Sequence, residues 1–228
     1  MARRTPRTVL VTATLGALVF AGAVAGAALT RTDPAPTPPP SAAGTTAPAT
    51  TSDPRADGCL REPCRVLRTA TLGDTRVELV ADSGAKTGRL RIGGPGTSRV
   101  IEIGEIGVLL PEGALQCYPA SISACLVRAE GTRGQTGKVV VGRSGKWSSL
   151  ERAYLSTAGY IVLNNIVADS GPEVVTAQCS SESCGTVHAQ VFTLVGSTVG
   201  CTRGYSSVEA LPGYPAVEVA ASRLRPCA

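Results

Sequence analysis

Residues 173–195 read EVVTAQCSSESCGTVHAQVFTLV. Two runs rich in valine, 173–177 and 187–195, have the length and the β-branched composition of strands. Between them, Cys179 and Cys184 enclose four residues, three of which are serines that suit a turn. This stretch therefore predicts two strands that flank a turn closed by a disulfide.

Strand-like runs recur along the chain, and turn residues such as those at 93–96 and 131–137 separate them. No window after the N-terminal segment shows a sustained helical period, and the best helix candidate, 148–155, is short. The composition therefore predicts an all-β domain. The further expected strands are 64–72, 77–81, 99–103, 125–129, 138–141, 160–167 and 216–220.

Eight cysteines allow 105 pairings. Proximity along the chain favours three short bridges and leaves a fourth, longer one by elimination. On the chain-entropy estimate each short loop stabilises by roughly 2 kcal/mol and the longest by roughly 3.5 kcal/mol. The longest bridge is expected to fasten the C-terminus to the sheet. The predicted pairs are Cys59–Cys64, Cys117–Cys125, Cys179–Cys184 and Cys201–Cys227.

The chain also carries signs of a repeat. Cys64, Cys125 and Cys184 are separated by 61 and 59 residues, and a strand, a glycine-containing turn and a second strand follow each of them. The pentapeptide VADSG occurs at 80–84 and again at 167–171. A period of this kind predicts β-sheets that are stacked or arranged radially, each burying its apolar face against a neighbour.

The stretches 73–80 (GDTRVELV) and 168–175 (ADSGPEVV) resemble the turn and following strand of FG-GAP repeats in integrin-type β-propellers. Fainter echoes lie at 138–142 and 217–221. The resemblance implies a β-propeller-like or stacked β-sheet domain. Calcium-binding repeats of that family carry several spaced Asp or Asn residues, whereas 82–84 and 169–171 hold one carboxylate each. Calcium needs six to eight oxygen ligands, so no metal site is expected.

The chain begins with three arginines among residues 1–7, and residues 8–30 carry no charge. This run is long enough to cross a bilayer, with its cationic flank on the cytoplasmic side. Residues 1–31 are therefore predicted to be a signal-anchor helix that leaves the rest of the chain outside the cell. A cleaved signal peptide, with removal near Ala27, is the alternative that stays open.

Residues 32–56 are rich in Pro, Thr, Ala and Ser and hold no large apolar residue, so they are predicted to be a disordered linker. The folded domain is expected at 57–228. It carries 17 Lys and Arg against 15 Asp and Glu, a net charge of +2, compared with +5 for the whole chain. This small excess, without a basic stripe, excludes nucleic acid as an expected partner. In its bias toward Ala, Gly and Arg, its Pro/Thr linker and its paired cysteines, the chain resembles an uncharacterised family of exported actinobacterial proteins.

The cysteines offer little other chemistry. Four of them, Cys59, Cys64, Cys179 and Cys184, could form a zinc site, but an oxidising exterior favours disulfides. A redox pair needs the Cys-x-x-Cys spacing, which neither of these pairs has. No cofactor and no metal are therefore expected.

Catalytic candidates are few. His188 is the single histidine, and strand alternation makes it a solvent-facing residue. No Gly-x-Ser-x-Gly nucleophile motif occurs. A glycan hydrolase needs two carboxylates about 5 to 9.5 Å apart, which sequence alone cannot place. The scattered candidates for such a pair are Glu102, Glu105, Glu112, Glu151 and Glu173.

Trp147, Tyr154 and Tyr160 lie close together in a chain that has few aromatic residues. They are a candidate ligand surface, although packing in the core explains them as well. We therefore expect a membrane-tethered, extracytoplasmic binding domain without catalytic activity, for a protein or cell-wall partner. The alternatives are a cell-wall glycan hydrolase and a structural envelope spacer.

Overall fold

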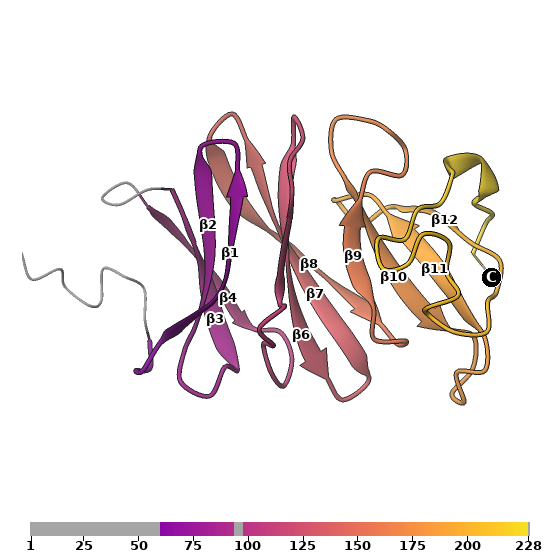
Figure 1. Ribbon diagram of the computed structural model, residues 1–228, viewed down its shortest axis with the longest axis horizontal. Coiled ribbons are helices and arrows are strands. Elements are labelled where there is room, and N and C mark those ends of the chain that lie inside the picture. The colour runs from indigo at the N-terminus through magenta and orange to yellow at the C-terminus, as the bar shows by residue number, and fades with distance from the viewer. Residues whose placement is uncertain (1–59, 94–97, 228) are drawn as a thin grey trace, which may run out of the picture. The chain divides into compact units, whose positions relative to one another are not determined.

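The computed structural model describes residues 60–93 and 98–227. Twelve strands run through these residues, and their one helical element is the short 3₁₀ helix η2 (Ala221–Arg223). The all-β prediction is therefore confirmed (Figure 1). The strands are Arg65–Leu72 (β1), Thr75–Ala81 (β2), Thr87–Ile92 (β3), Arg99–Glu105 (β4), Leu115–Tyr118 (β5), Ser123–Gly131 (β6), Gly134–Arg143 (β7), Lys146–Ser156 (β8), Ile161–Asn164 (β9), Glu173–Cys179 (β10), Val187–Phe192 (β11) and Thr198–Cys201 (β12).

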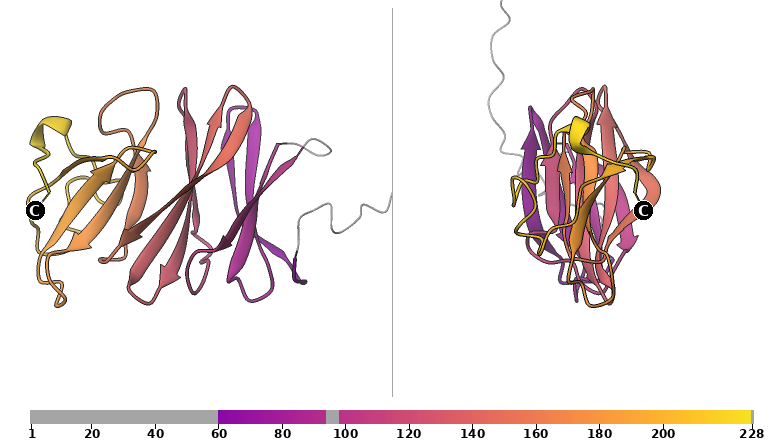
Figure 2. Two further views of the ribbon diagram at one scale, coloured as in Figure 1. Left: turned by 180° about the vertical axis from the view of Figure 1, so that it is seen from behind. Right: turned by 90° about the vertical axis from the view of Figure 1, so that its right-hand side faces the viewer.

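The strands form three antiparallel sheets of four, each made from consecutive strands: sheet A from β1–β4, sheet B from β5–β8 and sheet C from β9–β12. All three belong to one compact unit of the chain. Figures 1 and 2 show the sheets following one another in chain order, with sheet B between the other two.

Sheet B is buried on both faces, and the sequence of β6 explains why. Side chains alternate along a strand, so Cys125 and Val127 pack with sheet A while Ala124 and Leu126 pack with sheet C. All four are fully buried. A strand between two layers must be apolar on both faces, which accounts for the unbroken run from Ala124 to Val127.

Sheet A has one apolar and one charged face. Its apolar face, with Val77, Leu79 and Leu90, packs with sheet B in one core cluster. On the other face Glu78 accepts from Arg76 at 2.6 Å and from Arg91 at 2.8 Å. One ion pair lies within β2 and the other joins β2 to β3, and together they offset charge on that face and suit it to the outer layer of a stack.

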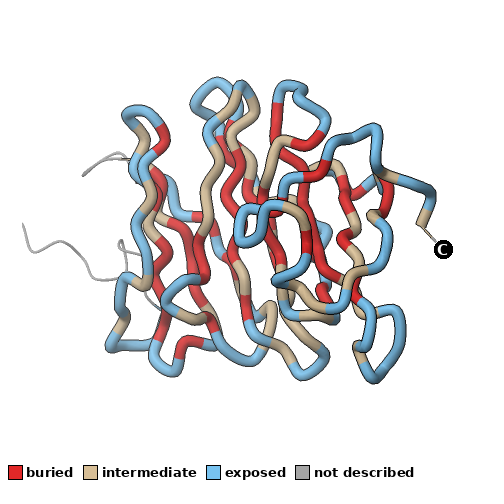
Figure 3. Tube along the Cα trace, turned by 45° about the vertical axis from the view of Figure 1, so that its right-hand side comes forward, coloured by how far each residue is buried: buried red, intermediate tan, exposed pale blue. Residues whose placement is uncertain are grey.

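The second face of sheet C is covered by the irregular segment that follows β12. Val175, Ala189 and Val191 pack there against Leu211, Val217 and Val219, all of them buried. Figure 3 shows buried residues along the strands and also at intervals within this covering segment. The strand expected at 216–220 is wrong, because the Ala216 and Val217 carbonyls accept from the Asn164 side chain instead of joining a strand ladder.

The short helix candidate at 148–155 is a strand in the structure, because these residues belong to β8, which pairs with β7. Trp147 and Tyr154 are seven residues apart, an interval that fits one face of a helix. In a strand the same interval places them on opposite faces. Trp147 accordingly packs toward sheet A and Tyr154 toward sheet C.

The structure has a repeat, but its register differs from the predicted one. The second strands of the sheets begin at Thr75, Ser123 and Glu173, so the repeat is about 50 residues long. Cys64 precedes β1, Cys125 lies in β6 and Cys184 follows β10, so the cysteines do not mark equivalent positions. The two VADSG copies likewise lie in different connections, β2–β3 and β9–β10.

Three of the four predicted disulfides are present: Cys117–Cys125, Cys179–Cys184 and Cys201–Cys227. Cys59, the predicted signal-anchor 1–31 and the linker 32–56 lie outside the described residues, and the Cys59–Cys64 pair stays a prediction. Within 60–93 and 98–227 no helix is long and apolar enough to cross a membrane.

Candidate functional site

The three aromatic residues singled out in the sequence lie in three different core clusters. Trp147 is buried between sheets A and B, and its ring lies against Gly142 on the neighbouring strand. Tyr154 is buried between sheets B and C, where its hydroxyl donates to the Leu194 carbonyl at 2.8 Å and its ring packs on Phe192. The structure therefore uses these two side chains in packing and does not bring them together.

Tyr160 lies on the other side of sheet C, against the C-terminal segment. Its hydroxyl donates to the Pro215 carbonyl at 2.6 Å, and its ring contacts Tyr214. Burial is the main reason that its pKa rises to about 12. Tyr160 therefore attaches the C-terminal segment to sheet C, and no surface formed by the three aromatic residues is assembled.

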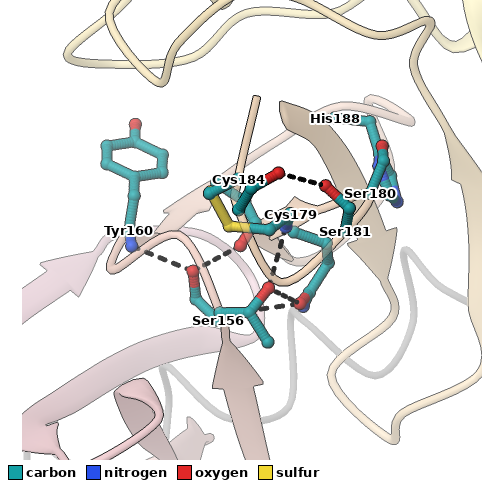
Figure 4. Close-up of a disulfide and its surroundings, with 11 residues drawn as sticks. Ser156, Tyr160, Cys179, Ser180, Ser181, Cys184 and His188 are labelled. Atoms are coloured by element: carbon teal, nitrogen blue, oxygen red, sulfur yellow. Dashed lines mark hydrogen bonds between the residues drawn. A yellow bond between two sulfur atoms is a disulfide. The ribbon is translucent and has the colours of Figure 1, made fainter. Parts of the chain in front are cut away.

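His188 and the disulfide loop 179–184 are shown in Figure 4. The Ser180 hydroxyl lies 3.4 Å from His188 Nδ1, and this is the one hydrogen-bond partner of the ring among the described residues. A serine-hydrolase triad needs a carboxylate on the second ring nitrogen, and the described residues place none there. At the same end of the loop, the Cys179 amide donates to Thr157 Oγ1 at 2.8 Å, and Ser156 Oγ donates to the Ala177 carbonyl. These contacts attach the loop to the end of β8.

The candidate carboxylates lie on separate elements. Glu173 is buried on β10, and its Oε2 accepts from the Ile166 and Val167 amides at 2.7 and 3.2 Å. It therefore holds the loop after β9. The other four are exposed: Glu102 and Glu105 on β4, Glu112 before β5 and Glu151 on β8. The described residues contain no cluster of three or more His, Cys, Asp or Glu side chains that could hold a metal ion.

A cavity of about 460 Å³ lies within the C-terminal segment, lined only by residues between positions 202 and 225. Its lining includes three arginines, Arg203, Arg223 and Arg225, together with Glu218 and Ser222. None of the three arginines forms an ion pair with another described residue. All three are exposed, so their charges are open to solvent and to a ligand.

The walls of this cavity are fixed by contacts at both ends of the segment. The Cys201–Cys227 disulfide closes the segment, and the amides of Cys201 and Arg225 each donate to the other's carbonyl, at 2.8 and 2.9 Å. Tyr205 pairs in the same way with Val187 of β11, and the Arg203 guanidinium lies over the Tyr205 ring, 5.2 Å from its centre. The cavity is therefore held against sheet C by a covalent bond and two isolated β-bridges.

Gly200 allows this close attachment. A Cβ atom at Gly200 would lie 2.9 Å from Leu224 Cβ and 3.0 Å from the Arg225 carbonyl oxygen, closer than side chains tolerate. Leu224 packs into the apolar cluster on sheet C. The absence of a side chain at position 200 thus lets the segment that carries Arg223 and Arg225 lie directly on β12.

The spacing of two cysteines in the sequence is a signal for this cavity. Cys201 and Cys227 are 26 residues apart and close a loop between them. Just inside the two ends of this loop lie three arginines, Arg203, Arg223 and Arg225. A bridge that joins the ends of a loop also gathers the residues near those ends. Comparison with known proteins adds no further assignment, since no family model, no curated protein and no solved structure matches the chain.

Proposed function

We propose that this chain is a non-catalytic binding domain, displayed outside the cytoplasm on an N-terminal signal-anchor and linker, and that the cavity lined by Arg203, Arg223 and Arg225 is its binding site. The observation that carries the proposal is a set of three arginines, without ion pairs among the described residues, around a cavity of ligand size. Cationic side chains without ion-pair partners attract an anionic ligand, and arginines do no acid or base chemistry near neutral pH.

The disulfides support the proposed location. Bridges of this kind form and persist in oxidising compartments outside the cytosol, and the chain carries at least three. They also support a role in binding, because a site held by a covalent bond and by packed sheets loses little conformational entropy when a ligand binds. The partner is proposed to be a component of the cell envelope.

The proposal also includes the arrangement of the sheets, which is either propeller-like or stacked. Each sheet is a meander of four consecutive strands, as a propeller blade is, and the sheets recur about every 50 residues. A charged face on sheet A and a covering segment on sheet C favour a stack with two ends over a closed ring.

Labelling of intact cells tests the location. Lys146 is exposed at the start of β8, so an amine reagent that cannot cross membranes should modify it in cells that express the full chain. Modification of Lys146 only after lysis would contradict an extracytoplasmic domain.

Sedimentation tests the binding function. The full chain, purified in non-ionic detergent, is mixed with envelope fragments of the cells that produce it and then centrifuged. We expect the wild-type chain to sediment with the fragments and the triple variant Arg203→Gln, Arg223→Gln, Arg225→Gln to stay in solution. Equal sedimentation of the two proteins would contradict binding through the cavity. Release of reducing sugar ends from the fragments would favour the glycan-hydrolase alternative, and no sedimentation of either protein would favour the spacer.

A further inference from the structure

We infer that the ligand of the cavity is a phosphate group on a carrier the size of a glycerol or sugar unit. This inference rests on the proposed function and specifies its chemistry. The residues that line the cavity include three arginines and, as their one carboxylate, Glu218. At neutral pH the lining therefore carries a net charge of +2.

The charge balance favours phosphate over a carboxylate. A phosphate monoester carries about −1.5 to −2 at pH 7, which neutralises a lining of +2, whereas a single carboxylate leaves one positive charge. Guanidinium groups also bind phosphate oxygens through paired hydrogen bonds. Three such groups match the three terminal oxygens of a phosphate monoester.

The other lining residues suit the carrier of the phosphate. Ser222, on η2, and Tyr205 bring hydroxyl groups, and Val219 and Pro212 bring apolar surface. A volume of about 460 Å³ lies within the range of sites for small organic molecules. The cavity can therefore hold a phosphate together with a short polar carrier.

The direct test is calorimetric titration of the full chain, oxidised and in non-ionic detergent, with inorganic phosphate, with glycerol 3-phosphate and with glucuronate. We expect saturable binding of both phosphates, tighter for glycerol 3-phosphate, and at least about tenfold weaker binding of glucuronate, from the loss of one charge-assisted contact. Glucuronate binding as tight as that of glycerol 3-phosphate would overturn the inference, and so would the absence of heat with both phosphates.

Two substitutions should move the affinity in opposite directions. Arg223→Gln removes a positive charge and should raise the Kd for glycerol 3-phosphate about five- to tenfold, whereas Glu218→Gln removes the opposing charge and should lower the Kd by a similar factor. Arg133→Gln, in the exposed β6–β7 turn, is the matched control and should leave the Kd unchanged. A gain in affinity cannot come from misfolding. An unchanged Kd in both cavity variants would therefore contradict the inference.

Two further measurements distinguish a lipid carrier from a soluble or polymeric one, and distinguish a failure of the phosphate assignment from a failure of the binding function. Doping the detergent micelles with phosphatidic acid, a lipid that carries a phosphate monoester, should compete with glycerol 3-phosphate if the natural carrier is a lipid, and should not compete if the carrier is soluble or part of a wall polymer. If the chain sediments with envelope fragments through its arginines but binds neither phosphate, the phosphate assignment is wrong and the binding function stands. If it does not sediment, the proposed function fails whatever the phosphate titration gives.

Discussion

Asp82 is a buried carboxylate that holds the start of the described chain on sheet A. Its Oδ1 accepts from the Leu60 amide at 2.9 Å, and its Oδ2 accepts from Thr87 Oγ1 at 2.6 Å and lies 3.5 Å from Arg89 Nη2. Burial on its own would raise the pKa of Asp82, but the hydrogen bonds from Thr87 and Leu60 and the charge of Arg89 together hold this pKa below its ordinary value.

The substitution Asp82→Asn should lower the free energy of unfolding by about 1 to 3 kcal/mol, because it disrupts buried hydrogen bonds. A carboxyl whose pKa is lowered in the folded state stabilises the protein above its unfolded pKa, and this stability is lost as the pH falls through the folded value. The wild type should therefore lose stability below about pH 4, and the variant should lose less. Urea unfolding at several pH values measures both effects.

Asp169→Asn is the control, because Asp169 stands in the same Asp-Ser-Gly tripeptide but is exposed. It should change the stability by no more than about 0.5 kcal/mol. Equal losses of unfolding free energy in the two variants would show that the hydrogen bonds of Asp82 do not stabilise the fold more than those of an exposed aspartate.

Tyr160 gives a second prediction at the residue scale. Its pKa is raised to about 12, chiefly by burial, so its neutral form is favoured in the folded protein. Its contribution to stability should be complete below about pH 10 and should be lost between about pH 10 and pH 12. The phenolate absorbance of the wild type minus that of Tyr160→Phe should rise near pH 12. A difference curve centred near pH 10 would contradict the buried position of Tyr160.

Sheet B depends on close contact between neighbouring strands at Gly142 and Trp147. A Cβ atom at Gly142 would lie 2.6 Å from two atoms of the Trp147 ring. Gly142→Ala should therefore lower the free energy of unfolding by about 1 to 3 kcal/mol through overpacking. Gly113→Ala, where a Cβ would meet nothing within 4 Å, should be nearly neutral. Chemical unfolding of the two variants decides this, and equal stabilities would rule out the tight Gly142 contact.

At the C-terminal segment, Gly200→Ala should separate the segment from β12. The amides of Cys201 and Arg225, which donate to each other's carbonyls, should exchange their hydrogens at least about tenfold faster, since local opening determines the protection of such groups. Gly185→Ala adds a Cβ with nothing within 4 Å and should leave both rates unchanged. Unchanged rates in Gly200→Ala would mean that the segment does not depend on this contact.

For the molecule as a whole, the sequence predicted the all-β fold class and three of the disulfides, because strand composition, turn residues and cysteine spacing are local signals. The short helix candidate at 148–155, which is part of β8, shows where such signals become ambiguous. The seven-residue interval between Trp147 and Tyr154 fits a helix face and also fits opposite faces of a strand, and only the layers on both sides of sheet B decide between them.

The candidate site was less predictable, for a related reason. Trp147, Tyr154 and Tyr160 are neighbours in the sequence, but alternation and sheet stacking send them to three different clusters. Arg203 and Arg223 are far apart in the sequence and line one cavity. The Cys201–Cys227 bridge, which cysteine spacing predicts, closes the loop that contains this cavity.

Titration of two disulfide variants with glycerol 3-phosphate tests most directly whether the Cys201–Cys227 bridge builds the proposed binding cavity. Both variants are first shown to be folded by circular dichroism. Cys201→Ser/Cys227→Ser should bind at least about tenfold more weakly than the wild type, since its cavity is no longer preorganised. Cys179→Ser/Cys184→Ser, which removes a bridge outside the cavity, should bind like the wild type. Equal affinities in the two double variants would contradict the claim.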